Sequence, residues 1–492
     1  MKTNTLDFDA QAMRERILDL AMRGKLVPQD PNDEPASVLL EKIKAEKEEL
    51  VKEKKIKKTK ALPAITDDEK PFGIPDSWEW VRLGDIALSI NDGVHFKPKY
   101  VKSGIKFATA KNISSGKLDL SQTDYISRED YDEFSKKVNP ELGDLLLSKD
   151  GTIGAAAIND SKEKLGLLSS IAVVKTDKNQ VSNYYLSYVI KSPFIQRQIK
   201  ENIRGITYRH WNLKRINTTY IPFPPLSEQK RIAAKIAQLF ALLRKVESST
   251  QQYAELQTLL KSKVLDLAMR GKLVKQDPND EPASVLLEKI KAEKAELVKE
   301  KKIKKSKPLP PITDKEKPFD IPDNWRWIRL GDVSKDIRYG YTASAQETGN
   351  SKLVRITDIQ NGRVDWNTVP FCDVPDNKIK ALQLLKDDIL IARTGGTIGK
   401  SYKIKDIPTT AVFASYLIRI RFLLIGKENY TKYVMQSPLY WSFISKKQSG
   451  TGQPNVNATK LSEFIFPLPP LSEQSRIATK IANLFTLLQL ED

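Results

Sequence analysis

The longest regular hydrophobic pattern in the chain spans residues 227–271. Its apolar side chains recur every three or four positions, a spacing that places them on one face of an α-helix. Ser227 is expected to cap the start of this helix, with Glu228 in its first turn, and Gly271 is expected to end it. The stripe consists of Ile232, Ile236, Leu239, Leu243, Val246, Tyr253, Leu256, Leu260, Val264 and Leu267.

A helix of about 44 residues would be ~65 Å long, whereas helices of globular proteins usually have about 8–20 residues. The pattern favours an antiparallel helical spacer over a helix packed inside one globular domain. Its partner would be a second rod formed by the two ends of the chain, because residues 8–27 match 255–274 and residues 472–492 match 227–247. We therefore expect the chain ends to lie together and to close a pseudo-two-fold molecule.

The same offset runs through much of the sequence. Residues 17–86 return at 264–333, with about 58 of 70 positions identical, and residues 224–243 return at 469–488. The intervening segments, which we call the first cassette (87–221) and the second cassette (334–466), share little beyond a Gly-Thr-Ile-Gly turn. The chain thus repeats one scaffold around two different inserts.

A charged helix follows the long helix in each repeat. Ser37 and Ser284 are expected to cap it, and it ends in the run KEKKIKK at 52–58 and 299–305. This run is either an arm that contacts DNA or a partner, or a solvated helix end with Glu–Lys pairs; its mixed charge favours the second interpretation. Pro-rich linkers then lead into the strands WEWVRLGDI and WRWIRLGDV, whose tryptophans we assign to the core.

The cassettes read as β-rich domains with a helical end. Strands are predicted within 144–158, 168–176, 388–404 and 411–422, and helices around 184–202 and 430–448. The Gly-Thr-Ile-Gly segments are expected to be hairpin turns. Residues 395–401, GGTIGKS, approach a phosphate-binding loop, but the required first glycine would fall on Thr394.

The amino-acid composition limits the classes of function that the chain can have. The 492 residues carry 81 Lys and Arg against 62 Asp and Glu, a net charge of +19, so nucleic acid is the first partner to consider. Cys372 alone excludes a disulfide framework, and His95 and His210 leave little for a zinc site. Without an apolar run of about 18 residues or a signal peptide, the chain is expected to be cytoplasmic.

The enzymatic motifs that we sought are absent from the sequence: a G-x-G-x-x-G, an Asn/Asp-Pro-Pro-aromatic tetrapeptide and a P-loop. This favours a binding protein. Two alternatives stay open, namely a DNA-acting enzyme with dispersed catalytic residues and a basic helical scaffold. Loops that mix basic, aromatic and amide side chains suit DNA, because Arg can read guanine, Asn or Gln can read adenine and Lys binds phosphates. These loops lie at 94–100, 203–215, 336–344 and 446–460.

The repeated motif P-x-P-P-L-S-E-Q-x-R-I, at 222–232 and 467–477, together with the W-x-W-x-x-L-G-D strands and the G-T-I-G turns, resembles the specificity subunit of type I restriction–modification enzymes. The resemblance covers essentially the whole chain. It implies an α+β protein, with two α/β target recognition domains separated by long antiparallel helices in a circular, pseudo-two-fold repeat. Each domain would read one half of a bipartite, asymmetric site in double-stranded DNA.

The resemblance also implies partners. The helices would dock two modification (methyltransferase) subunits that use S-adenosylmethionine, and restriction subunits would add ATP- and Mg²⁺-dependent cleavage. No catalytic residue, metal or bound cofactor is expected in this chain itself.

The expected domains follow from the repeat. They are an N-terminal helix (1–27), a charged arm and linker (28–77), target recognition domain 1 (78–222), a central helix (223–274), a second arm and linker (275–324), target recognition domain 2 (325–467) and a C-terminal helix (468–492).

The candidate site residues fall into two groups. The DNA-binding candidates are His95, Lys97, Lys99, Lys149, Thr152, Arg204, Tyr208, Arg209, His210, Arg338, Tyr341, Arg393, Thr397, Lys400, Gln453, Asn455 and Asn457. The partner-binding candidates are Glu228, Gln229, Arg231, Glu473, Gln474 and Arg476.

Overall fold

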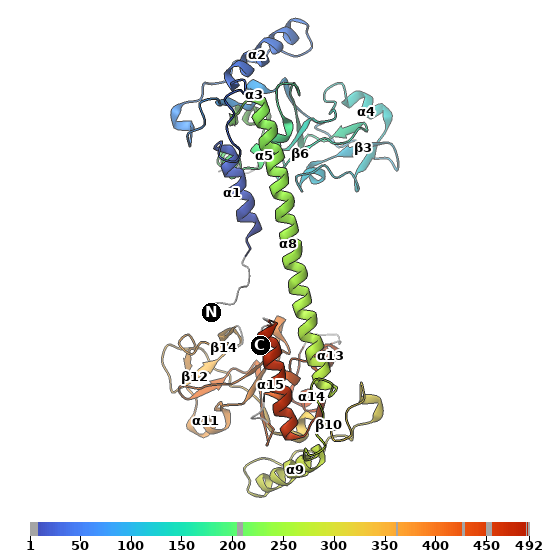
Figure 1. The fold of residues 1–492 in the computed structure, drawn as a ribbon, viewed down its shortest axis with the longest axis vertical. Coiled ribbons are helices and arrows are strands. Elements are labelled where there is room, and N and C mark those ends of the chain that lie inside the picture. Colours follow the sequence, from blue (N-terminus) through green and yellow to red (C-terminus); the bar gives the residue numbers. More distant parts are fainter. Residues whose placement is uncertain are drawn as a thin grey trace. The chain divides into compact units, whose positions relative to one another are not determined.

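The computed structural model describes residues 8–203, 210–360, 363–425, 429–448, 455–488 and 490 (Figure 1). The chain divides into two compact units, an N-terminal unit of Asn4–Thr250 and a C-terminal unit that includes Gln251–Asp492. Each unit is described by itself.

The predicted long helix is confirmed. It is α8, Leu226–Met269, with 44 residues, and it contributes its first half to the N-terminal unit and its second half to the C-terminal unit. Gly271 follows it with a φ of +68°, a left-handed conformation that favours glycine and ends the helix. Ser227 is not the cap, because the helix already begins at Leu226, directly after Pro225.

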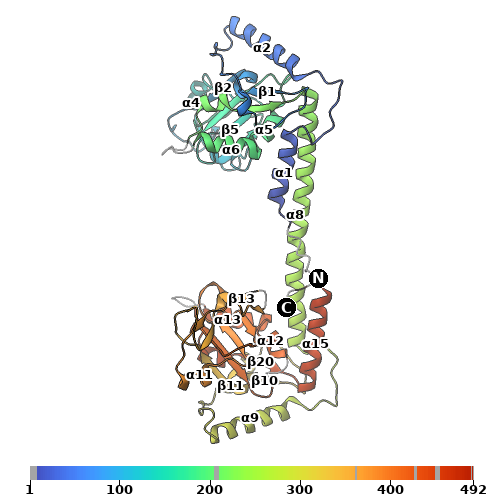
Figure 2. The same cartoon turned by 90° about the vertical axis from the view of Figure 1, so that its left-hand side faces the viewer.

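In each unit a terminal helix packs antiparallel to α8 (Figure 2). Helix α1, Ala10–Met22, buries Ile17 and Leu18 in the same core as Ile232 and Ile236 of α8. Helix α15, Leu471–Leu487, does the same in the C-terminal unit, where Lys261 of α8 lies over the ring of Phe485. The expectation that the two chain ends meet concerns the relation between the units and stays a prediction.

The middle of the apolar stripe differs from the prediction. Tyr253, Leu256 and Leu260 are exposed, whereas Val264 and Leu265 are buried. The described terminal helices reach only the outer parts of α8, since α1 begins at Ala10 and α15 ends at Leu487. Burial of the whole stripe was therefore a wrong expectation for these three residues and for Val246, which is also exposed.

The two cassettes have the same sheet order. A four-stranded antiparallel sheet runs β2-β8-β5-β6 in the N-terminal unit and β11-β19-β16-β17 in the C-terminal unit. A three-stranded sheet accompanies it, in the orders β4-β3-β7 and β15-β12-β18, with one parallel pair each. The α+β class and the repeat are confirmed, and the G-T-I-G segments connect the antiparallel pairs β5–β6 and β16–β17 as predicted.

The strands of the N-terminal unit are β1 (Glu79–Arg82), β2 (Ser89–Asp92), β3 (Ile105–Ala108), β4 (Asp124–Ile126), β5 (Leu145–Ser148), β6 (Ala156–Ile158), β7 (Leu165–Leu167), β8 (Ile171–Lys175) and β9 (Tyr220–Phe223). Its further helices are α2 (Ala36–Lys52), α3 (Leu83–Ile86), α4 (Arg128–Phe134), α5 (Asn183–Lys191), α6 (Pro193–Asn202) and α7 (Leu213–Thr218).

The strands of the C-terminal unit are β10 (Arg326–Arg329), β11 (Ser334–Tyr339), β12 (Ser351–Val354), β13 (Ile359–Gln360), β14 (Arg363–Val364), β15 (Phe371–Cys372), β16 (Ile389–Ala392), β17 (Ser401–Lys403), β18 (Ala411–Phe413), β19 (Leu417–Phe422) and β20 (Ile465–Leu468). Its further helices are α9 (Ala283–Lys299), α10 (Leu330–Val333), α11 (Asp376–Leu382), α12 (Tyr430–Val434), α13 (Pro438–Gln448) and α14 (Ala458–Ser462).

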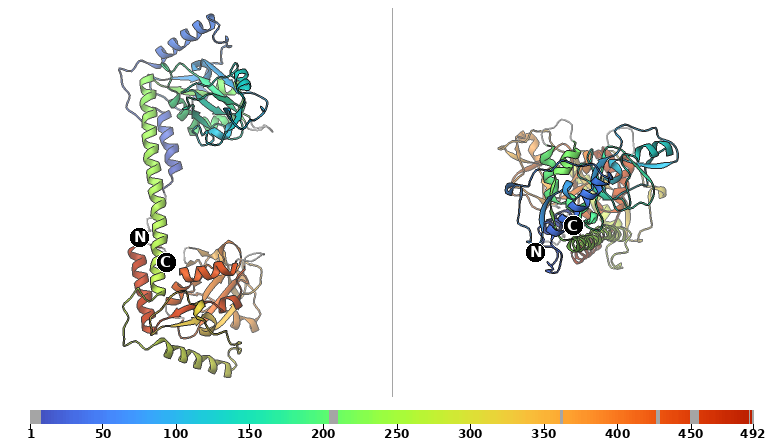
Figure 3. Two further views of the ribbon diagram at one scale, coloured as in Figure 1. Left: turned by 90° about the vertical axis from the view of Figure 1, so that its right-hand side faces the viewer. Right: turned by 90° about the horizontal axis from the view of Figure 1, so that it is seen from above.

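The charged helices α2 and α9 lie outside the cassettes (Figure 3). Each begins directly after a proline, Pro35 or Pro282, so Ser37 and Ser284 lie in the first turn and are not caps. Trp78 and Trp325, which precede β1 and β10, are buried as predicted, whereas Trp80 and Trp327 are only partly buried. In the described part of the chain, no helix is long and apolar enough to cross a membrane.

Candidate nucleic-acid interface

In each unit two loops start from the ends of two strands that flank the same strand of the four-stranded sheet, β8 or β19. In the N-terminal unit, β2 ends at Asp92 and β5 is followed by Lys149. In the C-terminal unit, β11 ends at Tyr339 and β16 is followed by Arg393. We call these the Asp92 cluster and the Tyr339 cluster.

Backbone hydrogen bonds show that the two clusters occupy equivalent positions. The carbonyl oxygen of Lys149 accepts a bond of 3.0 Å from the backbone N–H of Trp211, and that of Arg393 accepts one of 3.1 Å from Val456. The sheet register agrees, since Asp92 pairs with β8 as Tyr339 pairs with β19. The same backbone frame therefore presents different side chains in the two units.

A glycine follows each of β2 and β11 and brings the loop close to the end of β7 or β18, in the three-stranded sheet. A Cβ atom on Gly93 would lie 2.0 Å from the carbonyl oxygen of Leu167. A Cβ atom on Gly340 would lie 2.2 Å from the carbonyl oxygens of Phe413 and Ala414. Only glycine fits such an approach, so the path of both loops is fixed by their sequence.

The Asp92 cluster is an ion-pair network. The ammonium of Lys149 lies 2.6 Å from a carboxylate oxygen of Asp92, and that of Lys137 lies 3.0 Å from the other. His95 also contacts this carboxylate, at 3.2 Å. Burial opposes ionisation of Asp92, but the hydrogen bonds from Lys149 and Lys137 outweigh it and hold the pKa of Asp92 below its usual value.

The Tyr339 cluster is a stacked arrangement. The guanidinium carbon of Arg393 lies 4.6 Å from the centre of the Tyr339 ring, and its Nε donates to Oδ1 of Asn455 at 3.4 Å. The hydroxyl of Tyr339 accepts a bond of 3.0 Å from the backbone N–H of Ala458. The Tyr339 side chain is thus fixed by its backbone in β11 and by the hydrogen bond to its hydroxyl. Its ring attracts the guanidinium of Arg393 through a cation–π interaction.

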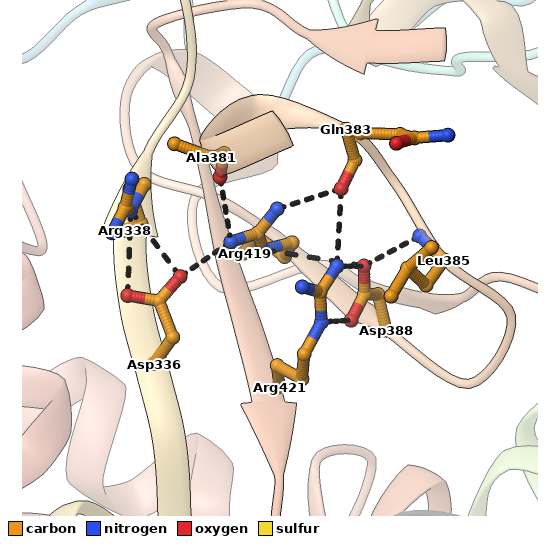
Figure 4. A network of polar contacts seen from close by, with 8 residues as sticks. All are labelled: Asp336, Arg338, Ala381, Gln383, Leu385, Asp388, Arg419 and Arg421. Carbon is orange, nitrogen blue, oxygen red and sulfur yellow. Dashed lines mark hydrogen bonds and ion pairs between the residues drawn. The ribbon is translucent and has the colours of Figure 1, made fainter. Parts of the chain in front are cut away.

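A charge network that includes the buried residues Asp388 and Arg419 also involves Asp336 of β11, the strand that ends at Tyr339 (Figure 4). Arg419 is 1% exposed and pairs with Asp336 of β11, while its Nη1 donates to the backbone carbonyl of Gln383 at 2.9 Å. Arg421 forms two bonds with Asp388, of 2.6 and 2.7 Å. Burial lowers the pKa of Arg419, and the neighbouring Arg421 lowers it further, against the opposing effect of the two carboxylates.

This network fixes strand β11. Asp336 lies three residues before Tyr339 on this strand. Arg338 stands opposite Arg419 in the register of β11 and β19. The equivalent of Arg419 in the N-terminal unit is Val173, which occupies the same register on β8. The charge is therefore special to the unit that carries the stacked arginine.

Most of the predicted DNA-binding residues that the structure describes lie at the surface. Exposed or partly exposed are His95, Lys97, Lys99, Thr152, His210, Arg338, Tyr341, Arg393, Thr397, Lys400, Asn455 and Asn457. The structure brings Arg393 and Asn455 together, and it brings His210 to Asp150 on the turn that also carries Thr152. Arg204, Tyr208, Arg209 and Gln453 lie outside the described residues.

Lys149 needs a correction. Its side chain is only 3% exposed, because Asp92 draws the ammonium into the protein, so it is not available as a surface contact in this structure. Asn457 is also partly committed, since its side-chain oxygen caps α14 by accepting from the backbone N–H of Lys460.

Four of the partner-binding candidates also need a correction. Glu228, Gln229, Glu473 and Gln474 are at most 1% exposed. The carboxylate of Glu228 accepts hydrogen bonds from the indole of Trp78, at 2.8 Å, and from the side chain of Gln29. These residues were predicted at a docking surface, but they instead join the start of a long helix to its own unit.

The equivalent glutamate is held in the same way. The carboxylate of Glu473 accepts from the indole of Trp325 at 2.9 Å and from the side chain of Gln276. Arg231 and Arg476 are partly exposed, and each forms two bonds with an aspartate, Asp33 or Asp280. A role for these two arginines in docking stays a prediction.

Sequence reasoning missed Asp92, Tyr339 and Lys137. One signal was present: the glycine after Asp92 and the glycine after Tyr339 stand at the same offset as the preceding W-x-x-L-G-D motifs. This marks the two residues as equivalent, but nothing in the sequence identifies Lys149 and Arg393 as their partners. Those contacts depend on which strands become neighbours in the sheet.

A second basic feature is a pocket of about 510 Å³ between α1 and α6 of the N-terminal unit. Arg14, Lys191, Arg197 and Lys200 are among the residues that line it. Burial, with a smaller effect from Lys117, lowers the pKa of Lys191 to about 8. The described residues contain no group of three or more His, Cys, Asp or Glu side chains that could hold a metal ion.

Comparisons with known proteins agree with this geometry. A family profile described as "Type I restriction modification DNA specificity domain" matches residues 75–257 and again 322–492. The chain is 35% identical to the type I restriction enzyme EcoAI specificity subunit of Escherichia coli and 32% identical to the EcoEI specificity subunit of the same organism. Each comparison covers 97% of this chain and 89% of the relative.

The fold also has a counterpart among solved structures. A chain from a study of complex assembly and conformational transition of the type I R-M system superposes with a TM-score of 0.55 at 20% sequence identity. The superposition covers 85% of this chain and 93% of that chain. At this identity the likeness concerns the fold.

Proposed function

The chain belongs to the type I restriction–modification DNA specificity family, and we propose that it is the subunit that selects the DNA sequence for such a complex. Each cassette reads one half of a bipartite site. The observation that carries this proposal is the contrast between the Asp92 and Tyr339 clusters, which occupy one backbone frame with different side chains. Two such surfaces suit two different half-sites, and the net charge of +19 suits the DNA backbone.

The chain is a non-catalytic component in this proposal. Two modification subunits bind S-adenosylmethionine and methylate the DNA, and restriction subunits use ATP and Mg²⁺. The expected site of action is the cytoplasm. The long helices set the distance between the two cassettes and so the spacing between the half-sites. In other proteins that bind paired half-sites, the distance between the two DNA-binding domains has the same effect.

Exposed apolar residues of α8 support docking of the modification subunits on the helices. Tyr253, Leu256 and Leu260 are between 42% and 56% exposed. Apolar side chains clustered on an exposed helix face are a common feature of protein–protein interfaces. We propose docking on this exposed face of α8 in place of the four buried candidates, Glu228, Gln229, Glu473 and Gln474.

The proposal predicts that methyl transfer requires partners. The full chain is incubated with DNA and labelled S-adenosylmethionine, with and without its modification subunit, and label incorporated into DNA is measured. We expect incorporation only when both proteins are present. Methyl transfer or DNA cleavage by the chain alone would show that it is a DNA-acting enzyme, and transfer at one motif without the chain would show that sequence selection lies elsewhere.

A further inference from the structure

The guanidinium of Arg393 is a cation that no carboxylate among the described residues pairs with. Its guanidinium stacks on Tyr339 and its Nε donates to Asn455, but no carboxylate among the described residues lies within ion-pair distance. The side chain lies at the surface of the unit, beside the exposed Tyr339 ring and the exposed Asn455. Arg393 is thus a positively charged hydrogen-bond donor that is held in place, and no carboxylate among the described residues balances its charge.

Lys149, which occupies the equivalent position in the N-terminal unit, is buried and ion-paired. Lys149 is buried, and its charge is compensated by Asp92 at 2.6 Å, a carboxylate that Lys137 shares. Removing Lys149 from this pair to contact DNA would leave Asp92 buried without its closest counter-charge, which is costly. The same backbone position is therefore structural in one unit and free to bind in the other.

The geometry of Arg393 suits recognition of a planar, two-acceptor group. With Nε engaged by Asn455, the terminal nitrogens Nη1 and Nη2 have no bond to a described residue. Stacking on Tyr339 restricts the plane of the guanidinium, which lowers the entropy lost when two parallel hydrogen bonds form. Tyr339 is itself fixed by its bond from Ala458.

The major-groove edge of guanine presents two acceptors, O6 and N7, to which arginine binds in a bidentate manner. We infer that Arg393 reads a guanine in the half-site bound by the C-terminal unit, with Tyr339 as its positioning residue, and that Lys149 reads no base in the other half-site. This inference rests on the proposed function. The alternative for Arg393 is a phosphate contact, which would carry no sequence preference.

The test uses the full chain assembled with its modification subunits. The methylated motif is first mapped for the wild type, and binding is then measured on duplexes in which each base pair of the second half-site is changed in turn. For one guanine, substitution should weaken wild-type binding about tenfold or more. In Arg393→Ala the same substitution should change binding less than about twofold, while preferences at the first half-site are unchanged.

A matched control is Lys400→Ala, which removes an exposed cation from the turn that follows β16. It should weaken binding to all sequences alike and lower the salt slope by about one phosphate contact. If Arg393→Ala behaves in this way, or leaves the preference intact, the inference is overturned. Should Arg393→Ala melt at a lower temperature, Arg393→Gln, which keeps a planar group over Tyr339, is used instead and should lose the guanine preference.

Failure of the proposed function would look different. A wild-type complex that methylates no defined bipartite motif contradicts the proposal that the chain selects DNA. A defined motif that is insensitive to Arg393 contradicts only the role of this residue.

Discussion

Two buried glutamates hold α8 and α15 to their units. Glu228 and Glu473 are almost fully buried, and their partners are neutral: an indole and an amide in each case. Burial raises the pKa of both carboxyls, and the hydrogen bonds from Trp78 and Trp325 offset it only in part. The folded protein therefore binds protons at these residues more tightly than the unfolded chain does.

This difference predicts a pH dependence of stability. As pH rises above the usual glutamate pKa of about 4.5, the unfolded chain releases these protons before the folded protein does, so stability falls through the window up to the raised pKa. The double variant Glu228→Gln/Glu473→Gln cannot ionise at these positions. Its melting temperature should fall less than that of the wild type between about pH 4 and pH 7.

A suitable control is the pair Glu34→Gln and Glu281→Gln, which changes two exposed carboxylates that pair with lysines at the surface. It should leave this pH-dependent loss in place. Identical pH profiles for the wild type and the double variant at residues 228 and 473 would mean that the two buried carboxyls do not titrate differently on unfolding.

Individual side-chain roles were the least predictable feature. The sequence indicated that Glu228 and Lys149 are functional, because each stands in or beside a distinctive motif. The structure shows that both are buried and partnered inside their unit. Burial and partner choice depend on contacts between segments far apart in the chain, and hydrophobic periodicity does not report them.

The strands and turns of the two cassettes form one architecture. Strands β2 and β11 are each followed by a glycine that lies against backbone carbonyls at the end of β7 or β18, in the three-stranded sheet. The loops that follow start from this point, so the glycine decides where the cluster residues are placed.

Gly340→Ala tests this dependence. The new Cβ atom would overlap the carbonyl oxygens of Phe413, the last residue of β18, and of Ala414, which follows it; both residues are buried. We expect a loss of about 1–3 kcal/mol in the free energy of unfolding, seen as a lower melting temperature.

Gly396→Ala serves as the control in the same cassette, because nothing lies within 4 Å of the position its Cβ would take. It should change stability by less than about 0.5 kcal/mol. Equal melting temperatures for the two variants would show that the approach of the β11 loop to the sheet is not tight in solution.

Whole elements were more predictable than side chains. The stripe in residues 227–271 predicted α8 nearly to its ends, because a long 3–4 spacing has few alternatives to a helix. The cap residues were wrong at Ser227, Ser37 and Ser284, where a preceding proline determines the start of the helix. Strands β5, β6, β8 and β16 to β19 lie within the predicted strand segments, whereas β2, β3, β4, β7 and β11 to β15 were not predicted. The order of the strands in the sheets came only from the structure.

The whole chain carries one scaffold twice. Each unit has its own terminal helix, its own strand pair and its own seven strands in two sheets of matching order. The difference between the units is concentrated in the cassettes, since the repeated segments are about 58 of 70 positions identical. The two halves of a DNA site should therefore be read independently.

Exchange of one cassette tests this independence. Residues 87–221 are replaced by the equivalent segment of a relative with a different sequence, and the variant is expressed with its modification subunit in a host whose methylated DNA motif is then mapped. The reciprocal exchange of residues 334–466 is the control. We predict that each exchange changes one half of the motif and leaves the other half intact; a change in both halves, or in neither, would contradict the modular reading of DNA by this chain.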